Sequence, residues 1–255
     1  SGGVPRIGGD WGLCDPTNPR NRRRRCALLV ERVAPCGGRT VVLVDTGPDI
    51  RDQLLEAGVT RIDAVFYTHP HADHIHGIDD LRGFALKERR RVDVYLDAAT
   101  SERVRTAFAY CFHTPPGSSY PPILNEHRLV PGERVTIDGA GGPIDMLPFL
   151  QRHGDIDSLG FRIGGLAYSS DLNDLPRESL GLLADLDVWI VDALRRHAHS
   201  SHFTLGQALD WIDRVGPRRA ILTNMHLDLD YQTLLDELPP GVEPAYDMMR
   251  VELPA

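Results

Sequence analysis

Among the 255 residues of the chain, one short segment concentrates the residue types that bind metal ions. Residues 68–77, THPHADHIHG, contain four histidines and one aspartate. Imidazole and carboxylate groups together suit Zn, Mn or Fe. Four of these donors fall within six positions, a spacing typical of metal sites, so we interpret His69, His71, Asp73 and His74 as ligands.

The chain before this segment predicts how the donors are held. An apolar, β-prone stretch directly before Thr68 predicts a buried strand that ends there. If the chain remains extended beyond it, alternate residues point to one side, which groups His69, His71 and Asp73. His74 follows directly and projects differently. The segment can then offer two donors to one metal and two to a second.

Further histidines and aspartates end apolar runs elsewhere, where strands deliver side chains to a shared sheet edge. One loop cannot complete two metal sites, so we expect His153, Asp171 and His226 to supply the rest, with the two oxygens of Asp171 bridging. Asp45 is expected to accept a hydrogen bond from a ligating histidine or to cap its loop. For Asp192, which ends another apolar run, turn capping is the favoured interpretation.

Three more histidines precede a predicted helix in the segment RRHAHSSHFTLGQAL. The helix dipole does not favour a protonated histidine at a helix N-terminus, so its presence there indicates a function. We expect His199 or His202 to donate a hydrogen bond or a proton to an anionic group, whereas His197 is interpreted as solvent-exposed. The helix cap is either Ser201 or Thr204.

Strand-like and helix-like segments alternate along the whole chain. Strands are predicted at residues 26–33, 40–47, 62–69, 92–97, 135–139, 144–151, 159–165, 166–171, 187–193, 219–226 and 248–253. Helices are predicted at residues 51–58, 100–112, 178–186, 204–216 and 231–239. This mixture predicts an α/β sandwich of two mixed sheets covered by helices. No linker divides the chain, so we predict one domain over residues 1–255.

Two details of this assignment bear on the site. The helix at 100–112 is expected to be capped by Thr100 or Ser101. The Pro-rich stretch at 113–128 is predicted to be a long loop that shapes the choice of substrate, with Tyr120 as a candidate contact.

Composition limits the classes of function. The net charge is -8 and the pI is near 5.7, which argues against an extended nucleic-acid surface. The arginine-rich run at 18–25 is interpreted as a solvated loop, with attraction of phosphate as the alternative. No apolar run reaches the ~20 residues of a membrane helix. No signal peptide is evident, and the four scattered cysteines are expected to be free thiols, so a cytoplasmic location is expected.

These motifs together resemble a known family. Residues 68–77 fit the HxHxDH motif of the metallo-β-lactamase superfamily, and His153, Asp171 and His226 fit its later metal motifs in order. The segments DTGPDIRDQL and GIDDLRGF resemble the branch of the phosphoribosyl cyclic phosphodiesterase, which is related to tRNA 3′-processing endonucleases. The resemblance covers nearly the whole chain and implies the αββα sandwich of that superfamily.

The resemblance also implies roles for individual residues. Two metals, Zn or Mn, would be held by one set of ligands each and by a shared carboxylate: His69, His71 and His153; Asp73, His74 and His226; and the bridging Asp171. Asp73 is expected to be a catalytic residue as well as a metal ligand. His202 takes the role of phosphate-binding or acid-catalytic histidine, with His199 as the rival, and Arg82 is a candidate to offset charge on the substrate. His76 has no place in either set.

The chain departs from that branch in two respects. The cyclic phosphodiesterase carries a structural zinc on a CxCxxC motif near its N-terminus, whereas the stretch GLCDPTNP keeps only Cys14 and has Pro16 and Pro19 instead. Because proline cannot ligate, this zinc is predicted to be absent. No inserted arm that would grip tRNA is apparent, which counts against tRNA as the substrate.

The sequence therefore predicts a binuclear metal-dependent phosphodiesterase. A hydroxide held between the metals would attack a small phosphodiester, such as a phosphoribosyl 1,2-cyclic phosphate or a nucleotide. The alternatives are hydrolysis of a carbonyl substrate such as a lactone, thioester or β-lactam, a tRNA 3′-end endonuclease-like activity, and a non-catalytic nucleotide- or metal-binding regulator. A homodimer is expected by analogy with related proteins.

Overall fold

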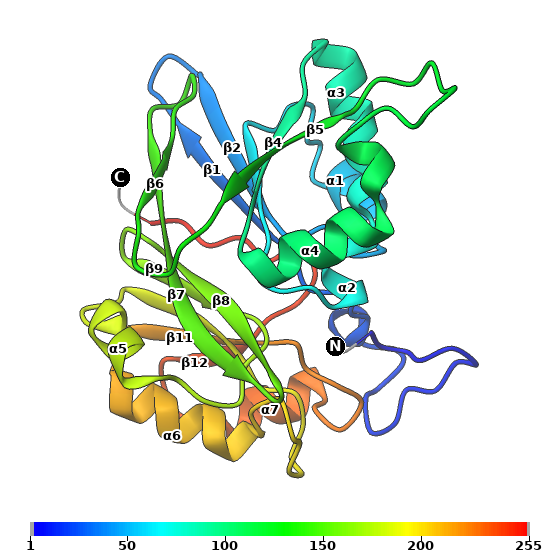
Figure 1. Ribbon diagram of the computed structural model, residues 1–255. Helices are drawn as coiled ribbons and strands as arrows, with labels where there is room; N and C mark the ends of the chain where they lie inside the picture. The colour runs from blue at the N-terminus through cyan, green and yellow to red at the C-terminus, as the bar shows by residue number, and fades with distance from the viewer. Residues whose placement is uncertain (1–2, 254–255) are drawn as a thin grey trace. The chain divides into compact units, whose positions relative to one another are not determined.

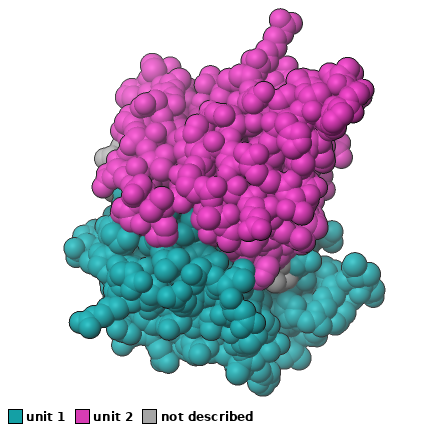
Figure 2. Space-filling view, in the orientation of Figure 1, with its two compact units in different colours: residues 1–26, 148–255 teal, residues 27–147 magenta. Residues whose placement is uncertain are grey.

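The computed structural model describes residues 3–253, and the chain divides into two compact units (Figures 1 and 2). The central unit is Ala27–Leu147. The terminal unit combines Ser1–Cys26 with Pro148–Ala255. Two mixed β-sheets with flanking helices confirm the predicted α/β class. The single domain over residues 1–255 stays a prediction.

The central unit contains a five-stranded sheet in the order β1-β2-β3-β4-β5. Its strands are β1 (Leu28–Val33), β2 (Arg39–Val44), β3 (Ala64–Phe66), β4 (Val92–Leu96) and β5 (Leu124–Arg128). β1 and β2 form an antiparallel hairpin, and the other neighbours are parallel. Its helices are α1 (Ile50–Glu56), α2 (Ala72–Ile75), α3 (Arg82–Glu88) and α4 (Ala98–Ala107), with 3-10 turns η2 (Ile78–Leu81) and η3 (Ala109–Cys111).

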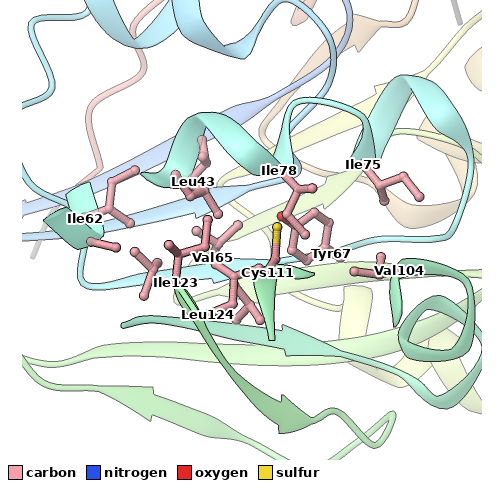
Figure 3. Close-up of a cluster of buried hydrophobic side chains, with 14 of the residues drawn as sticks. Leu43, Ile62, Val65, Tyr67, Ile75, Ile78, Val104, Cys111, Ile123 and Leu124 are labelled. Atoms are coloured by element: carbon pink, nitrogen blue, oxygen red, sulfur yellow. The ribbon is translucent and has the colours of Figure 1, made fainter. Parts of the chain in front are cut away.

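The core of the central unit anchors the histidine-rich segment. Val65 in β3 and Tyr67 just after it point to the same side of the chain, as the two-residue repeat of a strand requires. Figure 3 shows them in one cluster with Ile75 and Ile78, which lie on either side of His76. All four are buried, and each such side chain contributes roughly 1.5–3 kcal/mol. The metal-ligand motif is thus attached to the core at both ends.

The terminal unit is built on a larger sheet. The strand order is β12-β11-β10-β9-β8-β7-β6, and β7 (Ile144–His153) begins in the central unit, where its first residues pair with β6 (Val135–Ile137). The other strands are β8 (Ile156–Ile163), β9 (Leu166–Ser169), β10 (Val188–Asp192), β11 (Arg219–Thr223) and β12 (Val242–Pro244). β9 to β12 are parallel. Helices are α5 (Arg177–Leu180), α6 (Leu205–Val215) and α7 (Tyr231–Glu237), with η1 (Pro19–Asn21) and η4 (Gly181–Leu183).

Helix α6 fixes the loop in front of it. Leu205, Ala208 and Ile212 lie on one face of the helix and pack into the core of the terminal unit with Trp189. Thr204 accepts a hydrogen bond from the backbone of Gln207, whose side chain bonds back to Thr204, so the helix begins with a capping box. Of the two predicted caps, Thr204 is correct. His202 therefore lies two residues before a firmly fixed helix start.

Several predicted boundaries are wrong. Helix α4 is capped by Asp97, which accepts from the amide of Thr100 at 2.8 Å, so neither Thr100 nor Ser101 is the cap. Asp97, which directly follows β4, is already in place to satisfy the first free amides of the helix. The helix predicted at 178–186 is only the short α5 followed by η4.

Two strands were also misplaced. The loop predicted over 113–128 ends in β5, whose residues pair in parallel with β4 because a sheet edge is available there. No strand occurs at 248–253 within the described residues, since β12 pairs with β11 at that edge of the sheet.

None of the helices within residues 3–253 has the length and apolar character needed to cross a bilayer.

The arginine-rich run at 18–25 is not simply a solvated loop. Asn21 is completely buried and Arg23 is 7% exposed. Arg24 donates to Asp247 at 2.7 Å. The charge pattern alone does not reveal these partners, because they lie more than two hundred positions away along the chain.

Asp230 caps helix α7 and links its stability to pH. Burial tends to raise the pKa of this carboxyl, but hydrogen bonds from the amides of Thr233 and Asp15 and from Asn21 lower the pKa to about 2. The folded pKa lies below the ordinary value of ~3.9, so the stabilisation is complete above about pH 4 and is lost as the pH falls through about 2.

We therefore expect Asp230→Ala to lower the free energy of unfolding by about 1–2 kcal/mol at pH 7. The difference from the wild type should shrink steadily below pH 4. Urea unfolding at a series of pH values measures it. Asp236→Ala removes an exposed carboxylate from the same helix and should change little. If Asp230→Ala lowers the free energy of unfolding by the same amount at pH 2.5 and at pH 7, the lowered pKa of Asp230 is contradicted.

Candidate metal centre

The predicted ligands of the central unit gather at the end of β3. Nε2 of His69 lies 3.0 Å from Nδ1 of His71, and the rings of His69 and His74 are 4.2 Å apart between centroids. The expectation of an extended chain fails after His71, which is the N-cap of α2. Asp73 and His74 therefore lie in a helical turn, and Asp73 Oδ2 is 3.7 Å from His74 Nε2.

Asp45 orients this cluster, as expected. It is completely buried, and its Oδ2 lies 2.7 Å from Nδ1 of His74. The backbone amide and the hydroxyl of Thr68 both donate to its carboxylate at 2.8 Å. Burial raises the pKa of Asp45, although His74 and Thr68 oppose this. With Nδ1–H directed at a carboxylate, His74 presents the lone pair of Nε2, the form in which a histidine binds metal.

His76 lies outside this group. It is exposed, and its ring meets Phe108 edge-on at 5.7 Å between centroids. This agrees with its exclusion from both predicted ligand sets.

Gly77 locks the histidine-rich segment against the loop that follows β2. Its amide donates to the carbonyl of Thr46 at 2.8 Å, and the amide of Thr46 donates to the carbonyl of His74 at 2.8 Å. A Cβ at Gly77 would lie 2.2 Å from the carbonyl oxygen of Gly47 and 2.5 Å from a methyl group of Ile50. Only glycine permits this approach.

We expect Gly77→Ala to separate the two loops, to lower the free energy of unfolding by about 2 kcal/mol or more, and to weaken metal binding. Gly83→Ala is the matched control, because nothing lies within 4 Å of a Cβ there and alanine favours the helix. Denaturant unfolding and metal analysis of the two variants test this. Equal stabilities would show that the close packing at Gly77 is unimportant.

In the terminal unit, three predicted site residues converge. Nε2 of His153 and Nε2 of His202 each lie 3.7 Å from Oδ2 of Asp171, and all three residues are buried. Their donor atoms are close enough to hold one ion. His153 ends β7, Asp171 follows β9, and His202 precedes α6. The expectation that strands end in metal-binding residues singled out His153 and Asp171. The position before a predicted helix singled out His202.

His202 is oriented by Asp192. Its Nδ1 lies 2.7 Å from Oδ2 of Asp192, which also accepts from the amide of Leu172 at 3.3 Å. The prediction that Asp192 caps a turn therefore described only part of its role. Burial and the negative charge of Asp171 raise the pKa of Asp192 well above its usual value. Asn224, which the sequence analysis missed, donates to Asp171 at 3.2 Å; like the other site residues it directly follows a strand.

His199 and His226 are placed differently. The ring of His199 lies 5.0 Å from that of His202, but its Nδ1 accepts from the backbone of Ser201 rather than meeting a carboxylate. Burial and the neighbouring His202 lower the pKa of His199. His226 does not join the described group of the terminal unit. Its Nε2 lies 3.1 Å from the guanidinium of Arg6, a contact that the sequence did not predict.

The donor set of these clusters fits a divalent metal. Nδ1 of His153 donates to the carbonyl of Ser201 at 2.6 Å, in the same way that His74 and His202 direct Nδ1 at carboxylates. His74 and His153 then present Nε2 as a lone-pair donor, whereas Nε2 of His202 accepts or donates according to whether the ring is neutral or protonated. Buried imidazoles with a carboxylate are ligands that Zn and Mn accept.

A groove in the central unit brings together two predicted substrate contacts. Arg82 and Tyr120 line it with Tyr110, Pro115 and Ser118, and its volume is about 410 Å³. The guanidinium of Arg82 lies 5.9 Å from the centre of the Tyr110 ring. Tyr120 is 72% exposed. The loop predicted to shape substrate choice thus does form a concave surface with Arg82.

Comparison with known proteins identifies the family. Residues 40–225 match the Beta-lactamase superfamily domain. The chain therefore belongs to the β-lactamase superfamily and has the metallo-β-lactamase fold of metal-dependent hydrolases.

Solved structures place it more closely. A crystal structure of a diphosphatase from the PhnP family is 31% identical, with a TM-score of 0.86, and the match covers 99% of this chain and 93% of that one. The short form of human tRNase Z is 18% identical with a TM-score of 0.63, covering 96% and 98% of the two chains, which shows the shared fold. The PhnP family is the branch that the sequence motifs resemble.

Curated relatives are longer proteins. An octanoyltransferase of Porphyromonas gingivalis (strain W83) is 32% identical over 252 residues, which is 97% of this chain and 48% of that protein. A ribonuclease Z of Bradyrhizobium diazoefficiens is 35% identical over 148 residues, 56% of this chain and 45% of that protein. The chain thus spans about half the length of the curated relatives it matches.

Proposed function

We propose that this protein is a metal-dependent hydrolase that cleaves a small phosphodiester, in particular a cyclic phosphate or a nucleotide. The observation that carries the proposal is the buried pair of His202 and Asp192, with Nδ1 and Oδ2 2.7 Å apart, beside the His153 and Asp171 donors. A histidine held by a carboxylate next to metal ligands is arranged to transfer a proton. The similarity to a PhnP-family diphosphatase supports a phosphoryl substrate.

We propose that the chain holds two Zn or Mn ions through the ligands that the resemblance implies: His69, His71 and His153; Asp73, His74 and His226; and the bridging Asp171. When bound, such ions lower the pKa of a water molecule and polarise the phosphoryl oxygens. The carboxylates of Asp45 and Asp192 keep the tautomers of His74 and His202 fixed throughout.

His202 serves as the general acid in this account. Its Nδ1–H is directed at Asp192, so a proton on Nε2 faces the side of the ring where Asp171 lies. Protonated His202 offsets the charge that builds on the phosphoryl group and then gives its Nε2 proton to the leaving oxygen. The ring of His199 accepts from the amide of Ser201 and has no carboxylate partner within residues 3–253, which favours His202 over its rival.

The groove of Arg82, Tyr110 and Tyr120 is proposed to bind part of the substrate. Arg82 is paired with Asp79 at 2.7 Å, so its charge is partly neutralised and the aromatic faces dominate the surface. An exposed tyrosine suits stacking with a base or packing against a ribose. This arrangement favours a nucleotide-sized substrate over a long nucleic acid. The homodimer and the cytoplasmic location remain predictions.

A comparison of substrates tests the proposal. The chain loaded with Zn²⁺ or Mn²⁺ is assayed with bis-para-nitrophenyl phosphate, a 2′,3′-cyclic nucleotide, a nucleotide with a diphosphate linkage, a lactone and an octanoyl thioester. We expect kcat/KM for the best phosphoryl substrate to exceed that for either carbonyl substrate by at least about 100-fold, or about 2.7 kcal/mol. Faster hydrolysis of the lactone or thioester would refute the phosphodiesterase and support the alternative.

A further inference from the structure

The arginine-rich segment of the terminal unit contacts the loop that carries His226. Arg23 is 7% exposed, although a guanidinium is costly to remove from water. One nitrogen, Nη1, donates to the carbonyl of His226 at 3.2 Å, and the other, Nη2, donates to the carbonyl of Leu229 at 2.7 Å. The planar head of this arginine thus joins both ends of one short turn.

The two terminal nitrogens of Arg23 each have one further partner, whereas its buried Nε has none among the described residues. Nη1 contacts the sulfur of Cys14 at 3.8 Å, and Nη2 lies 3.4 Å from Oδ1 of Asn21. Cys14 itself contacts the carbonyl of Leu227 at 3.5 Å. The two shortest bonds of Arg23 go to backbone carbonyls and fix the backbone there, since hydrogen bonds from charged donors are the strong ones.

Neighbouring residues hold the same turn from a second direction. Asn21 donates to Asp230 at 2.6 Å and accepts from the amide of Tyr231 at 2.8 Å. The amide of Leu13 donates to the carbonyl of Leu227 at 2.8 Å. These bonds leave residues 226–231 attached to the N-terminal segment at nearly every position.

The approach of the two segments is close. A Cβ at Gly12 would lie 2.5 Å from Cβ of Leu227, and Gly12 has a positive φ of 56°. Val4 and Cys14 pack on Leu227 in a small buried cluster. The amide of His226 is meanwhile bound to the carbonyl of Leu194 at 2.8 Å, so the backbone of His226 is held on both sides.

We propose that Arg23 is a positioning residue that fixes the turn at 226–229 and thereby aims the imidazole of His226 as a metal ligand. The proposal rests on the proposed function only for the statement that His226 binds metal. Arg23 acts through the backbone of the turn and does not itself contact a substrate.

Lysine cannot replace arginine in this role. A lysine ammonium is a single point charge, whereas the guanidinium presents two nitrogens in a fixed plane to two separate carbonyls. Arg23→Lys therefore keeps the charge and loses the second attachment. Arg23→Gln is the second variant. It places no charge in the buried site, so we expect it to fold even if Arg23→Lys does not. Arg22→Ala is the matched control, since Arg22 is the exposed neighbour in the same run.

Two measurements on the full chain test the proposal. Amide hydrogen exchange of the metal-free protein should become about 10-fold faster at residues 226–231 in Arg23→Lys and Arg23→Gln, and stay unchanged in Arg22→Ala. Titration with Zn²⁺ against a competing chelator should show one of the two dissociation constants raised by about 10–100-fold in the Arg23 variants. The other constant should stay within about 2-fold.

The outcomes distinguish a failure of this inference from a failure of the proposed function. If the wild type binds two Zn²⁺ ions and both constants are unchanged in folded Arg23 variants, the positioning role is refuted and the proposed function stands. Faster exchange without any change in Zn²⁺ binding also refutes it, because Arg23 would then only stabilise the turn. A wild type that binds no Zn²⁺ refutes the proposed function and this inference with it.

Discussion

Replacing Asp171 by alanine should remove most of the bound metal and lower hydrolysis of bis-para-nitrophenyl phosphate by about 1000-fold or more, close to 4 kcal/mol of transition-state stabilisation. Asp171 is 2% exposed and lies 3.7 Å from the ring nitrogens of both His153 and His202. In the proposed ligand set Asp171 bridges the two metals, so its loss would withdraw one ligand from each of them. No other proposed ligand affects two ions.

Metal analysis of the purified variant, together with the assay, measures this effect. Asp155→Ala is a suitable control, because Asp155 is an exposed carboxylate in the turn just after His153. The control should keep two metals per chain and near wild-type turnover. An Asp171→Ala protein that still carries two metals would show that Asp171 does not bridge.

The second large effect is expected at His202. His202→Ala should lower kcat for a phosphodiester by about 100-fold to 10,000-fold, the range of a lost general acid, while metal content stays near two per chain. The reason is its pairing with Asp192 at 2.7 Å, which fixes the ring for proton transfer. A substrate whose leaving group needs no proton, such as para-nitrophenolate, should be less affected than a cyclic nucleotide.

His199→Ala and His197→Ala complete this experiment. His199 is the rival acid and His197 is exposed, so His197→Ala should be neutral. If kcat falls further in His199→Ala than in His202→Ala, His199 and not His202 is the general acid. Loss of metal from His202→Ala would make His202 a ligand, which its convergence with His153 and Asp171 also permits, and would exclude it as the acid.

Much of the site was predictable because chemistry and local geometry coincide there. His153 and Asp171 were found by one rule, that strands deliver side chains to the edge of a sheet. Asp45 was found because ligating histidines need a second hydrogen-bond partner. These rules use only residue types and the apolar runs directly before them, and both can be read from one sequence.

The contacts that escaped prediction join distant parts of the chain. Arg6 meets His226 across 220 positions, and Arg23 reaches the carbonyl of Leu229 across 206. A run of arginines looks the same in sequence whether it is solvated or buried. The pairing of Asp192 with His202 depends on how the loop before α6 folds back, which no periodic pattern encodes.

The fold was predicted to a similar extent. The two-residue alternation and the apolar runs located most strands, and capping chemistry narrowed the start of α6 to Ser201 or Thr204, of which the structure shows Thr204. The short helix α2 was missed because four residues are too few to show a helical period. The strand predicted at 248–253 was wrong: β12 pairs with β11 at that edge of the sheet, and the sequence analysis did not predict β12.

Reconstitution of the metal-free chain tests the central claim most directly. The protein is stripped with a chelator and titrated with Zn²⁺ or Mn²⁺, while bound metal and turnover of a cyclic nucleotide are followed together. We predict no turnover without metal, two ions bound per chain at saturation, and full activity only when both are present. Turnover by the stripped chain, or full activity with a single ion bound, would contradict a two-metal phosphodiesterase.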